Sequence, residues 1–372
     1  MPIKTLAYIA NVRFPSTRAH ATQIAHMCEA FSKSGISVNL FVSNREYKEG
    51  TLVRDFFDFE PSFAISRVPF RFIFFSSPIF FLLNNIYFCF WLLLNVDFKK
   101  FDVIYTRDEW LCYFLSFFIP IEKLVYESHE AKYNLPARRI LRTGVKCVVV
   151  SQGIFGRYQE LGVPVAQMMV ADDAIDDSFF VDIVSKEDAR KQLSLPSDAK
   201  VVMYIGGFDV WKGVDIFFEA SKKNKDVMFV AIGGKESELK EYKSKYPKVN
   251  FLGPRPYKDL KNHQQAADVL VIPNTAKTDL SSKYTSPLKL FAHMASGVPL
   301  ILSRIPSLTN IVEDGEAYFF KPDDVVSLSE VISAVTFSAE LKTGAKCLKA
   351  RSKMLTWGER SKKIISFIRG GK

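Results

Sequence analysis

The chain has 372 residues, of which 48% are hydrophobic and 24% are charged. This length and balance fit two ordinary α/β domains, each with its own core, and argue against a disordered or fibrous protein. The net charge of +10 favours anionic partners: nucleic acid, an anionic membrane surface or phosphorylated small molecules. The five scattered cysteines include no C-x-x-C pair, which predicts a reducing compartment without disulfides or a zinc site.

The first half of the chain alternates short β-rich runs with helical stretches. Residues 4–12 read as a buried strand rather than as a secretory signal. Residues 19–33 then place their apolar side chains on one helical face. The repeated β-α-β order predicts a parallel sheet covered by helices. The predicted strands are Thr5–Val12, Ser37–Val42, Val103–Tyr105, Leu124–Tyr126 and Cys147–Val150.

The region Val68–Val96 is apolar and aromatic enough to raise the question of membrane contact. A spanning helix needs about 20 uninterrupted apolar residues, and polar residues break every run here before that length. We therefore expect either buried helices or a monotopic face that dips into a lipid surface. The basic flanks, Arg67 with Arg71 and Lys99 with Lys100, keep the second interpretation open.

The second half starts the same β-α pattern again. Two such sheets in tandem predict two doubly wound domains, with ligands at the carboxyl ends of the strands. The join is expected near residues 171–180, where four aspartates make a polar break, so that the domains cover 1–175 and 176–354. The predicted strands are Val201–Ile205, Val227–Ile232, Val249–Leu252, Val269–Ile272 and Pro299–Leu302, and the predicted helices are Gly213–Ser221, Tyr257–Ala267, Pro287–Ala295 and Trp357–Ile368.

Two strand-to-helix segments of the second half carry the strongest functional signals. In the first, Gly206 and Gly207 end a strand and Lys212 opens a helix; glycines let a phosphate approach the backbone, and the lysine supplies charge. In the second, Ser286 is the predicted N-cap and Pro287 the first helical residue, which directs free amides and the positive end of the helix dipole outward. Taken alone, the first segment is a weak signal, because any strand-to-helix turn can look like it, and the second is better explained as an ordinary helix between two strands.

Together and in this order, these segments resemble the large family of retaining, nucleotide-sugar-dependent glycosyltransferases with the GT-B fold, known as family four or group one. The resemblance implies an α/β fold of two Rossmann-like domains facing a central cleft, with the C-terminal helix (355–372) packing back on the first domain. It covers nearly the whole chain. The segments that carry it are 13–20, Tyr126–His129, Ser151–Gly153, Asp173–Asp176, Tyr204–Gly213, Gly233–Gly234, Phe251–Gly253, Ser286–Gly297 and Trp357–Arg360.

The resemblance implies a glycosyltransferase that moves a sugar from a nucleotide-diphosphate donor to a glycan or lipid-linked acceptor with retention of configuration. Fixed positive groups stabilise the charge that develops on the leaving diphosphate. The implied catalytic residues are His129, which would face the transferred sugar, and Lys212. The implied donor-binding residues are Gly206, Gly207, Arg255, Tyr257, Ser286, Pro287, Leu288, Lys289 and Ala292. The residues expected to face the cleft or the acceptor are Thr17, Arg18, His20, Arg107 and Asp108.

The resemblance also implies that no metal and no cofactor are needed, because the lysine and the helix dipole take the place of a cation at the diphosphate. His129 keeps a second interpretation, that of a hydrogen-bonded histidine near a strand end. No carboxylate pair suggests a double-displacement nucleophile and acid. Nucleic acid is not expected as a partner, since the basic residues are spread along helices without the aromatic interleaving of a known module.

The chain departs from the family around the last motif. Most relatives carry two glutamates with seven residues between them, and here Tyr284 and Ala292 stand at those positions. The second glutamate binds the donor ribose, a charge-assisted hydrogen bond worth about 1.5–3 kcal/mol. Three explanations stay open: another group binds the ribose, the protein is an impaired or non-catalytic sugar-nucleotide-binding relative, or the chain is a Glu→Ala variant. Gly207 also replaces the arginine of the family's Arg-x-x-x-x-Lys pair.

The sequence leaves the sugar, the nucleotide (UDP or GDP) and the acceptor unassigned. The basic charge and the aromatic stretch from Phe70 to Trp91 suggest an acceptor at a membrane, such as a lipid-linked or surface-polysaccharide precursor. We therefore expect a cytoplasmic enzyme of polysaccharide biosynthesis that makes a peripheral contact with the inner face of the membrane.

Overall fold

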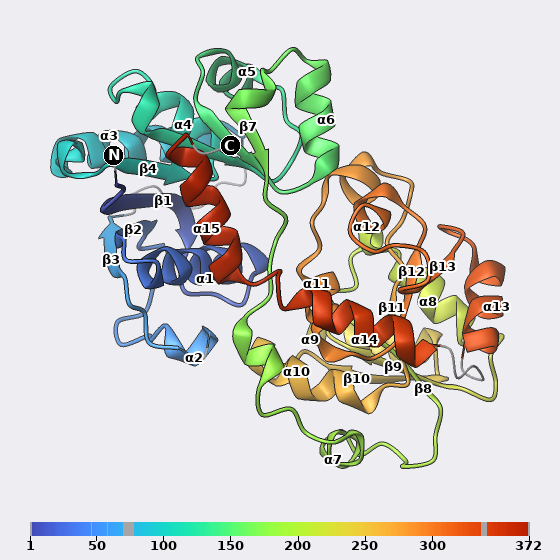
Figure 1. Cartoon of the computed structure of the whole chain (residues 1–372). Coiled ribbons are helices and arrows are strands. Elements are labelled where there is room, and N and C mark those ends of the chain that lie inside the picture. Colours follow the sequence, from blue (N-terminus) through green and yellow to red (C-terminus); the bar gives the residue numbers. More distant parts are fainter. Residues whose placement is uncertain (1, 46, 58, 70–77, 336–340, 371–372) are drawn as a thin grey trace. The chain divides into compact units, whose positions relative to one another are not determined.

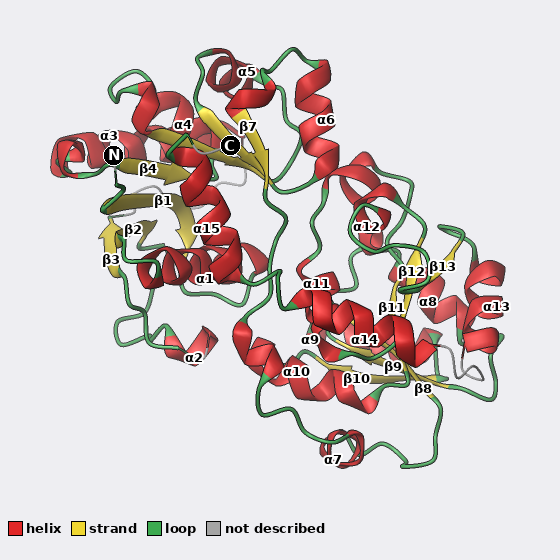
Figure 2. Ribbon diagram, viewed as in Figure 1, coloured by secondary structure: helices red, strands yellow, loops and turns green. Residues whose placement is uncertain are grey.

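The computed structural model describes residues 2–45, 47–57, 59–69, 78–335 and 341–370. The chain forms two compact units, each with its own parallel sheet and its own helices (Figure 1, Figure 2). The first unit contains Met1–Asp172 and Trp357–Lys372, and the second contains Asp173–Thr356. The second unit is therefore an uninterrupted segment, whereas the first is closed by the last residues of the chain.

The sheet of the first unit has the strand order β3-β2-β1-β4-β5-β6-β7, and every neighbouring pair is parallel. The chain starts in the middle of the sheet, runs outward through β2 and β3, and then crosses to β4 on the other side of β1. This arrangement confirms the prediction of a doubly wound parallel sheet, although the edge strands β3 and β7 were not predicted. The strands are β1 (Thr5–Arg13), β2 (Ser37–Ser43), β3 (Ala64–Val68), β4 (Val103–Thr106), β5 (Leu124–Ser128), β6 (Lys146–Val149) and β7 (Met168–Val170).

Helices α1 to α6 lie between the parallel strands in the sequence, as parallel pairing requires, whereas α15 joins the unit from the end of the chain. Helix α1 has the predicted bounds, and its residues from Ala21 to Phe31 are buried. The helices are α1 (Ala19–Lys33), α2 (Arg54–Phe57), α3 (Pro78–Asn95), α4 (Glu109–Leu115), α5 (Leu135–Arg142), α6 (Gln152–Glu160) and α15 (Trp357–Ile368), with short 3-10 turns η1 (Phe98–Lys100), η2 (Ile121–Lys123) and η3 (Val165–Gln167).

Helix α3 lies in the region for which membrane contact was predicted. Residues 70–77, which include the apolar run Phe72–Phe75 and Arg71, lie outside the described residues. Within the part of the chain that the structure describes, no helix combines the length and the apolar character needed to cross a membrane.

The last helix, α15, packs beside α1 in the first unit (Figure 1). The rings of His26 and Trp357 stack with their centroids 5.8 Å apart. At the other end of α15, the Lys146 ammonium donates to the carbonyl of Ile368 at 2.6 Å. This contact satisfies a carbonyl that the end of a helix leaves without an intrahelical partner.

Arg360 holds α15 in place from within the core of the first unit. Its guanidinium donates to the carbonyls of Ala171 (3.1 Å) and Asp172 (2.8 Å) and forms an ion pair with Glu127 at 3.3 Å. The side chain of Arg360 is 3% exposed and that of Glu127 is fully buried. Such a pair costs desolvation energy when it forms, but loss of one partner leaves an uncompensated buried charge.

The sheet of the second unit has the order β10-β9-β8-β11-β12-β13, again with every neighbouring pair parallel. Counted from its own first strand this is the 3-2-1-4-5-6 order of a Rossmann fold. Two Rossmann-like units were predicted, and both are present. The strands are β8 (Val201–Ile205), β9 (Met228–Ile232), β10 (Val249–Gly253), β11 (Val269–Ile272), β12 (Leu300–Ser303) and β13 (Tyr318–Phe320).

The helices of the second unit follow the prediction less closely than its strands. The single helix expected over Tyr257–Ala267 consists of η6, α10 and η7 in succession, and residues Leu280–Tyr284 form a π-helical turn, η8. The helices are α7 (Lys186–Gln192), α8 (Val214–Ala220), α9 (Glu236–Lys245), α10 (Leu260–His263), α11 (Leu288–Ser296), α12 (Pro306–Thr309), α13 (Val325–Val335) and α14 (Leu341–Ser352), with 3-10 turns η4 (Asp177–Phe180), η5 (Val210–Lys212), η6 (Tyr257–Asp259) and η7 (Gln264–Ala266).

We expect the substitution Arg360→Leu to destabilise the first unit by about 3–5 kcal/mol, because Glu127 would keep a buried carboxylate without its ion-pair partner. Urea unfolding followed by fluorescence measures this loss. Lys362→Met is the matched control, since Lys362 lies on the same helix but its ion pair with Glu359 is exposed. Equal stability of the two variants would contradict the role assigned to Arg360.

Candidate active site

Both units place polar residues at the carboxyl ends of their central strands, where the strand order reverses. In the first unit this point lies between β1 and β4, and in the second between β8 and β11. Open α/β sheets bind their ligands at such switch points. Most of the predicted site residues follow these strands or their neighbours, and the residues of each unit are described separately below.

In the second unit, two glycine turns leave the end of β8 open. Gly206 and Gly233 follow the neighbouring strands β8 and β9, and both have positive φ values. A Cβ atom on Gly233 would lie 2.1 Å from the carbonyl oxygen of Gly206, which excludes any side chain there. At Gly207 a Cβ would lie 2.9 Å from the Lys212 Nζ. Because these positions have no side chains, the backbone of the turn and the Lys212 ammonium lie close together.

Lys212 lies in η5, directly after this turn, and its side chain is 20% exposed. Its Nζ forms an ion pair with Asp209 at 2.6 Å, and the hydrogen bond from Lys212 lowers the pKa of the Asp209 carboxyl. The next residue, Gly213, has φ +62° and lies against the carbonyl of Pro273 after β11. Lys212 is thus fixed at the switch point by its neighbours in the sequence and by β11.

Helix α11 begins at Leu288 in the same unit, and its start differs from the prediction. Ser286 does not cap the helix: its hydroxyl accepts a hydrogen bond from the Asp173 amide at 2.8 Å, and Pro287 occupies the N-cap position without a side-chain cap. The prediction of Ser286 as N-cap is wrong because a residue distant in sequence takes its oxygen. The amides of Leu288 and Lys289 begin the helix and have no intrahelical acceptor.

The side chain of Lys289, on the first turn of α11, reaches back to the turn after β8. Its Nζ lies 3.4 Å from the Tyr204 hydroxyl and 3.5 Å from the position of a Cβ on Gly206. Three predicted donor-binding residues, Gly206, Gly207 and Lys289, and the predicted catalytic residue Lys212 are therefore brought together in the second unit.

Ala292, at the position of the missing glutamate, lies on the next turn of α11. It is 5% exposed and packs in an apolar cluster with Ile175 and Phe179. The ring of Tyr257, from the predicted base-binding loop, lies 5.3 Å from that of Phe179, whereas Arg255 is exposed. Alanine fits this cluster without placing an unpaired carboxylate among apolar groups.

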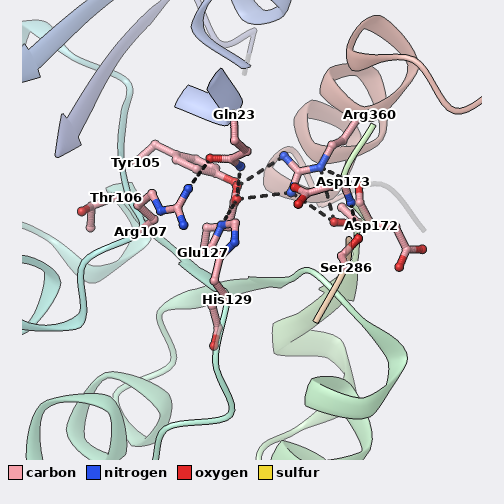
Figure 3. Close-up of polar contacts among 12 residues, drawn as sticks. Gln23, Tyr105, Thr106, Arg107, Glu127, His129, Asp172, Asp173, Ser286 and Arg360 are labelled. Carbon is pink, nitrogen blue, oxygen red and sulfur yellow. Dashed lines mark hydrogen bonds and ion pairs between the residues drawn. The ribbon is translucent and has the colours of Figure 1, made fainter. Parts of the chain in front are cut away.

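In the first unit, Glu127 at the end of β5 is the centre of a buried polar network (Figure 3). Its carboxylate accepts hydrogen bonds from Gln23, Tyr105 and His129 and pairs with Arg360. Burial opposes its ionisation, but the charge of Arg360 and the hydrogen bonds from His129 and Tyr105 hold the pKa of Glu127 well below its usual range.

His129 is the predicted catalytic histidine, and it lies at the rim of this network with its side chain 19% exposed. Its Nε2 is 2.6 Å from the Glu127 Oε1. Burial, together with the charge of Arg107, lowers the pKa of His129 to about 4, so the ring is neutral at pH 7. Since a neutral ring next to a carboxylate carries its proton on the bonded nitrogen, Nε2 donates to Glu127 and Nδ1 is left as an acceptor.

Arg107, which follows β4, belongs to the same network through a second hydrogen bond. Its Nη1 donates to the Gln23 Oε1 at 2.7 Å, and Gln23 donates onward to Glu127. Burial and the charges of Arg107 and Arg18 lower the pKa of His20 to about 4. Predicted residues from three separate segments therefore influence one another electrostatically at this edge of the sheet.

The remaining two predicted residues of this unit have different surroundings. Thr17 is exposed and lines a cavity of about 280 Å³ with Arg13 and Tyr47. Asp108 caps α4: its Oδ1 accepts from the amides of Trp110 (2.9 Å) and Leu111 (3.1 Å). Burial raises the pKa of Asp108 to about 6. Its carboxylate therefore serves as the N-cap of α4.

Sequence reasoning assigned no role to Glu127, Gln23, Tyr105, Arg360 or Tyr204. The available signal was a charged residue in a buried strand, since Glu127 stands among the apolar residues of β5. Buried carboxylates are rare unless they are paired. Among the described residues, no group of three His, Cys, Asp or Glu side chains is arranged to hold a metal ion.

Sequence comparison gives a match to one family model. Residues 199–336, which cover the core of the second unit, match the model described as glycosyl transferases group 1. The D-inositol 3-phosphate glycosyltransferase of Corynebacterium diphtheriae is 28% identical over 147 residues, which cover 35% of this chain and 32% of that protein. The enzyme of the same name from Mycolicibacterium smegmatis is 27% identical over 143 residues, with 35% and 31% covered. The aligned part thus spans about a third of these relatives.

Solved structures resemble the whole chain in fold. Sucrose-phosphate synthase from Thermosynechococcus elongatus superposes with a TM-score of 0.81 at 18% identity, covering 98% of both chains. Anabaena HepE, solved in complex with UDP and glucose, gives a TM-score of 0.73 at 16% identity, covering 99% of both chains. The lipopolysaccharide glycosyltransferase WaaG gives 0.70 at 14% identity, covering 98% of this chain and 100% of that one. The prediction of a GT-B type fold with two Rossmann-like domains is confirmed.

Proposed function

We propose that this chain, whose residues 199–336 match the model of group 1 glycosyl transferases, moves a sugar from a nucleotide-diphosphate donor to a glycan or lipid-linked acceptor. The observation that carries the proposal is the bare glycine turn after β8, where two lysine ammonium groups and the first amides of α11 come together. Such a set of donors suits a diphosphate leaving group.

The proposed donor site lies in the second unit. Lys212 neutralises the diphosphate once Asp209 releases it, and the amides of Leu288 and Lys289 donate to phosphate oxygens. Arg255 and Tyr257 hold the nucleotide base. HepE, a protein of the same fold, was solved with UDP and with UDP-glucose, which supports a nucleotide sugar as the donor.

In the first unit, we propose that His129 contacts the transferred sugar through Nδ1. The neutral ring can accept a hydrogen bond from a sugar hydroxyl, and Glu127 fixes its orientation. Thr17, Arg18, His20 and Arg107 would then lie on the acceptor side.

We further propose that the configuration at the anomeric carbon is retained and that no metal is needed. Lys212 and the α11 amides carry the charge of the leaving phosphate, which also serves as the base for front-face attack. Product anomers resolved by NMR and turnover in the presence of EDTA test the two statements.

Helix α3 supports an acceptor at a membrane. Asn85, Phe88 and Leu92 on one face are buried, whereas the opposite face is apolar and exposed. Residues spaced by 4, 11 and 15 positions share a helix face. The exposed face contains Ile79, Leu83, Phe90 and Leu94, which are 62%, 41%, 53% and 83% exposed.

Further apolar and basic groups continue this surface. Phe90 contacts Phe118, whose ring centroid lies 6.5 Å away, and both Phe117 and Phe118 are more than half exposed. The Arg139 guanidinium lies 4.2 Å from the Phe117 ring centroid. Aromatic residues bordered by cations are typical of proteins that bind an anionic lipid surface. We therefore propose a peripheral contact of α3 with the inner face of the membrane.

Ala292 favours a second candidate function, a sugar-nucleotide binder with impaired or absent transfer. Its side chain offers the ribose no hydrogen bond, and the apolar cluster around it supplies none. Binding without turnover would identify this alternative.

We expect UDP-sugars or GDP-sugars to stabilise the protein in a thermal-shift panel. A ligand at 100 times its Kd adds about 2.7 kcal/mol of stability through mass action. The active donor should also release its nucleoside diphosphate when acceptor extracts are added. If no nucleotide sugar raises the melting temperature, the proposed function is wrong.

We expect Ala292→Glu to improve use of the donor by roughly 10- to 150-fold, because a carboxylate can accept two hydrogen bonds from ribose. Initial rates at limiting donor concentration measure the gain. Ala292→Gln, which has the same shape without the charge, is the control and should gain less. Donor binding without transfer in Ala292→Glu would favour the non-catalytic alternative, and unchanged binding would show that position 292 is remote from the ribose.

We expect the protein to co-sediment with vesicles that contain phosphatidylglycerol at low salt. Leu83→Ser combined with Leu94→Ser should reduce binding at least about 10-fold, since burial of each leucine contributes about 1.5–3 kcal/mol. Val326→Ser is the matched control, because Val326 is exposed on a helix of the second unit. Equal binding of the double variant and the control would exclude α3 as the contact surface.

A further inference from the structure

Two ammonium groups from different elements converge on the turn after β8, and only one of them has an acidic partner. Lys212 pairs with Asp209 at 2.6 Å. Among the described residues Lys289 forms no ion pair: its Nζ donates to the Tyr204 hydroxyl at 3.4 Å and lies 4.7 Å from the centroid of that ring. Tyr204 in turn donates to the Gly207 carbonyl at 2.6 Å. Lys289 is therefore held over the turn by a neutral group.

The two ammonium groups occupy space beside the turn that side chains at 206 and 207 would contact. A Cβ on Gly207 would lie 2.9 Å from the Lys212 Nζ and 2.8 Å from the Asp209 Oδ2. A Cβ on Gly206 would lie 3.0 Å from the Tyr204 hydroxyl and 3.5 Å from the Lys289 Nζ. A side chain at 207 would therefore displace the Lys212 ammonium and the Asp209 carboxylate from their present positions, and α11 supplies the second positive charge at the turn.

We propose that the Lys289 side chain is the second cation of the diphosphate site and pairs with the phosphate oxygens that Lys212 does not neutralise. The inference rests on the proposed function, because the anion is taken to be the diphosphate of the donor. A diphosphate carries at least two negative charges, and two ammonium groups on either side of a bare turn match that charge.

The charge of Lys289 in the free protein supports this assignment. Burial, and next the repulsion from Lys212, lower the pKa of Lys289 to about 7, while Asp209 acts in the opposite direction. The other titratable groups that face it are neutral at pH 7: burial raises the pKa of Tyr204, and burial together with Lys289 lowers the pKa of His293 to about 3. A bound diphosphate would favour the charged form of Lys289.

Two linked effects follow from this pKa. At pH 8 the binding of a diphosphate should take up a proton on Lys289, whereas at pH 6 the proton is already present. In the free protein the unfolded chain binds this proton up to a pKa near 10.5, so Lys289 destabilises the fold fully below pH 7 and progressively less as the pH rises to 10.5. Removal of its charge should therefore raise the melting temperature at pH 7.

The test compares wild type with Lys289→Met, Lys289→Arg and the control Lys222→Met. Lys222 is half exposed and pairs with Glu219 on the surface of the same unit. Isothermal titration with UDP, GDP and inorganic pyrophosphate, at pH 6 and pH 8 in buffers of different ionisation enthalpy, gives affinity and proton uptake. We expect Lys289→Met to bind roughly 10- to 100-fold more weakly, to lose the proton uptake at pH 8 and to melt at a higher temperature without ligand. Lys289→Arg should retain more of the affinity, and Lys222→Met should behave as wild type.

The outcomes separate this inference from the proposed function. Binding of UDP or GDP that is equal in wild type and Lys289→Met overturns the role of Lys289 and leaves the proposed function intact. Binding of pyrophosphate that depends on Lys289, without binding of either nucleotide, supports the anion site and contradicts the nucleotide-sugar donor. Absence of binding to all three probes overturns both.

Discussion

The first unit depends on one carboxylate that is completely shielded from water. Glu127 accepts hydrogen bonds from α1, β4 and the residue after β5, and it pairs with Arg360 of the last helix. A buried carboxylate is tolerated only when its partners satisfy it, so these contacts form as a set. The same set orients the His129 ring and holds α15 against the unit. The position of the proposed catalytic histidine is therefore coupled to the closure of the fold.

The second unit differs from the first in how its charged groups are neutralised. Its switch point is built from glycines and helix amides, and one of the two ammonium groups there, that of Lys289, has a neutral hydroxyl and no acidic ion-pair partner in the described part of the chain. The arrangement is unfavourable in the free protein, because a partly buried ammonium lies close to another cation. A bound polyanion would remove this cost. The buried carboxylate of the first unit is thus neutralised without a ligand. In the second unit, a bound polyanion would further stabilise the two ammonium groups.

The elements that sequence patterns predicted best are those whose residues are uniformly buried or strictly periodic. The strands β8 and β11 and the helices α1 and α15 have the predicted bounds. The edge strands β3, β7 and β13 were missed because they are only three to five residues long and only partly buried, so they give no clear strand pattern. The cap at Ser286 was predicted wrongly because its oxygen bonds to Asp173, 113 positions away. Glu127 received no role for the same reason, since its partners Gln23 and Arg360 are 104 and 233 positions distant. Local patterns carry no information about such contacts.

The interruption of the first unit by the second has a consequence for biosynthesis. The second unit is one continuous segment, so it has all its strands before the last helix leaves the ribosome. At a translation rate of about 5–20 residues per second, Arg360 is synthesised roughly 10–50 s after Glu127. During that interval the nascent first unit contains a carboxylate without its cation and an uncovered surface on α1. Synthesis of the first unit therefore begins before that of the second and ends after it. A ribosome that stalls within residues 173–356 leaves the first unit without α15.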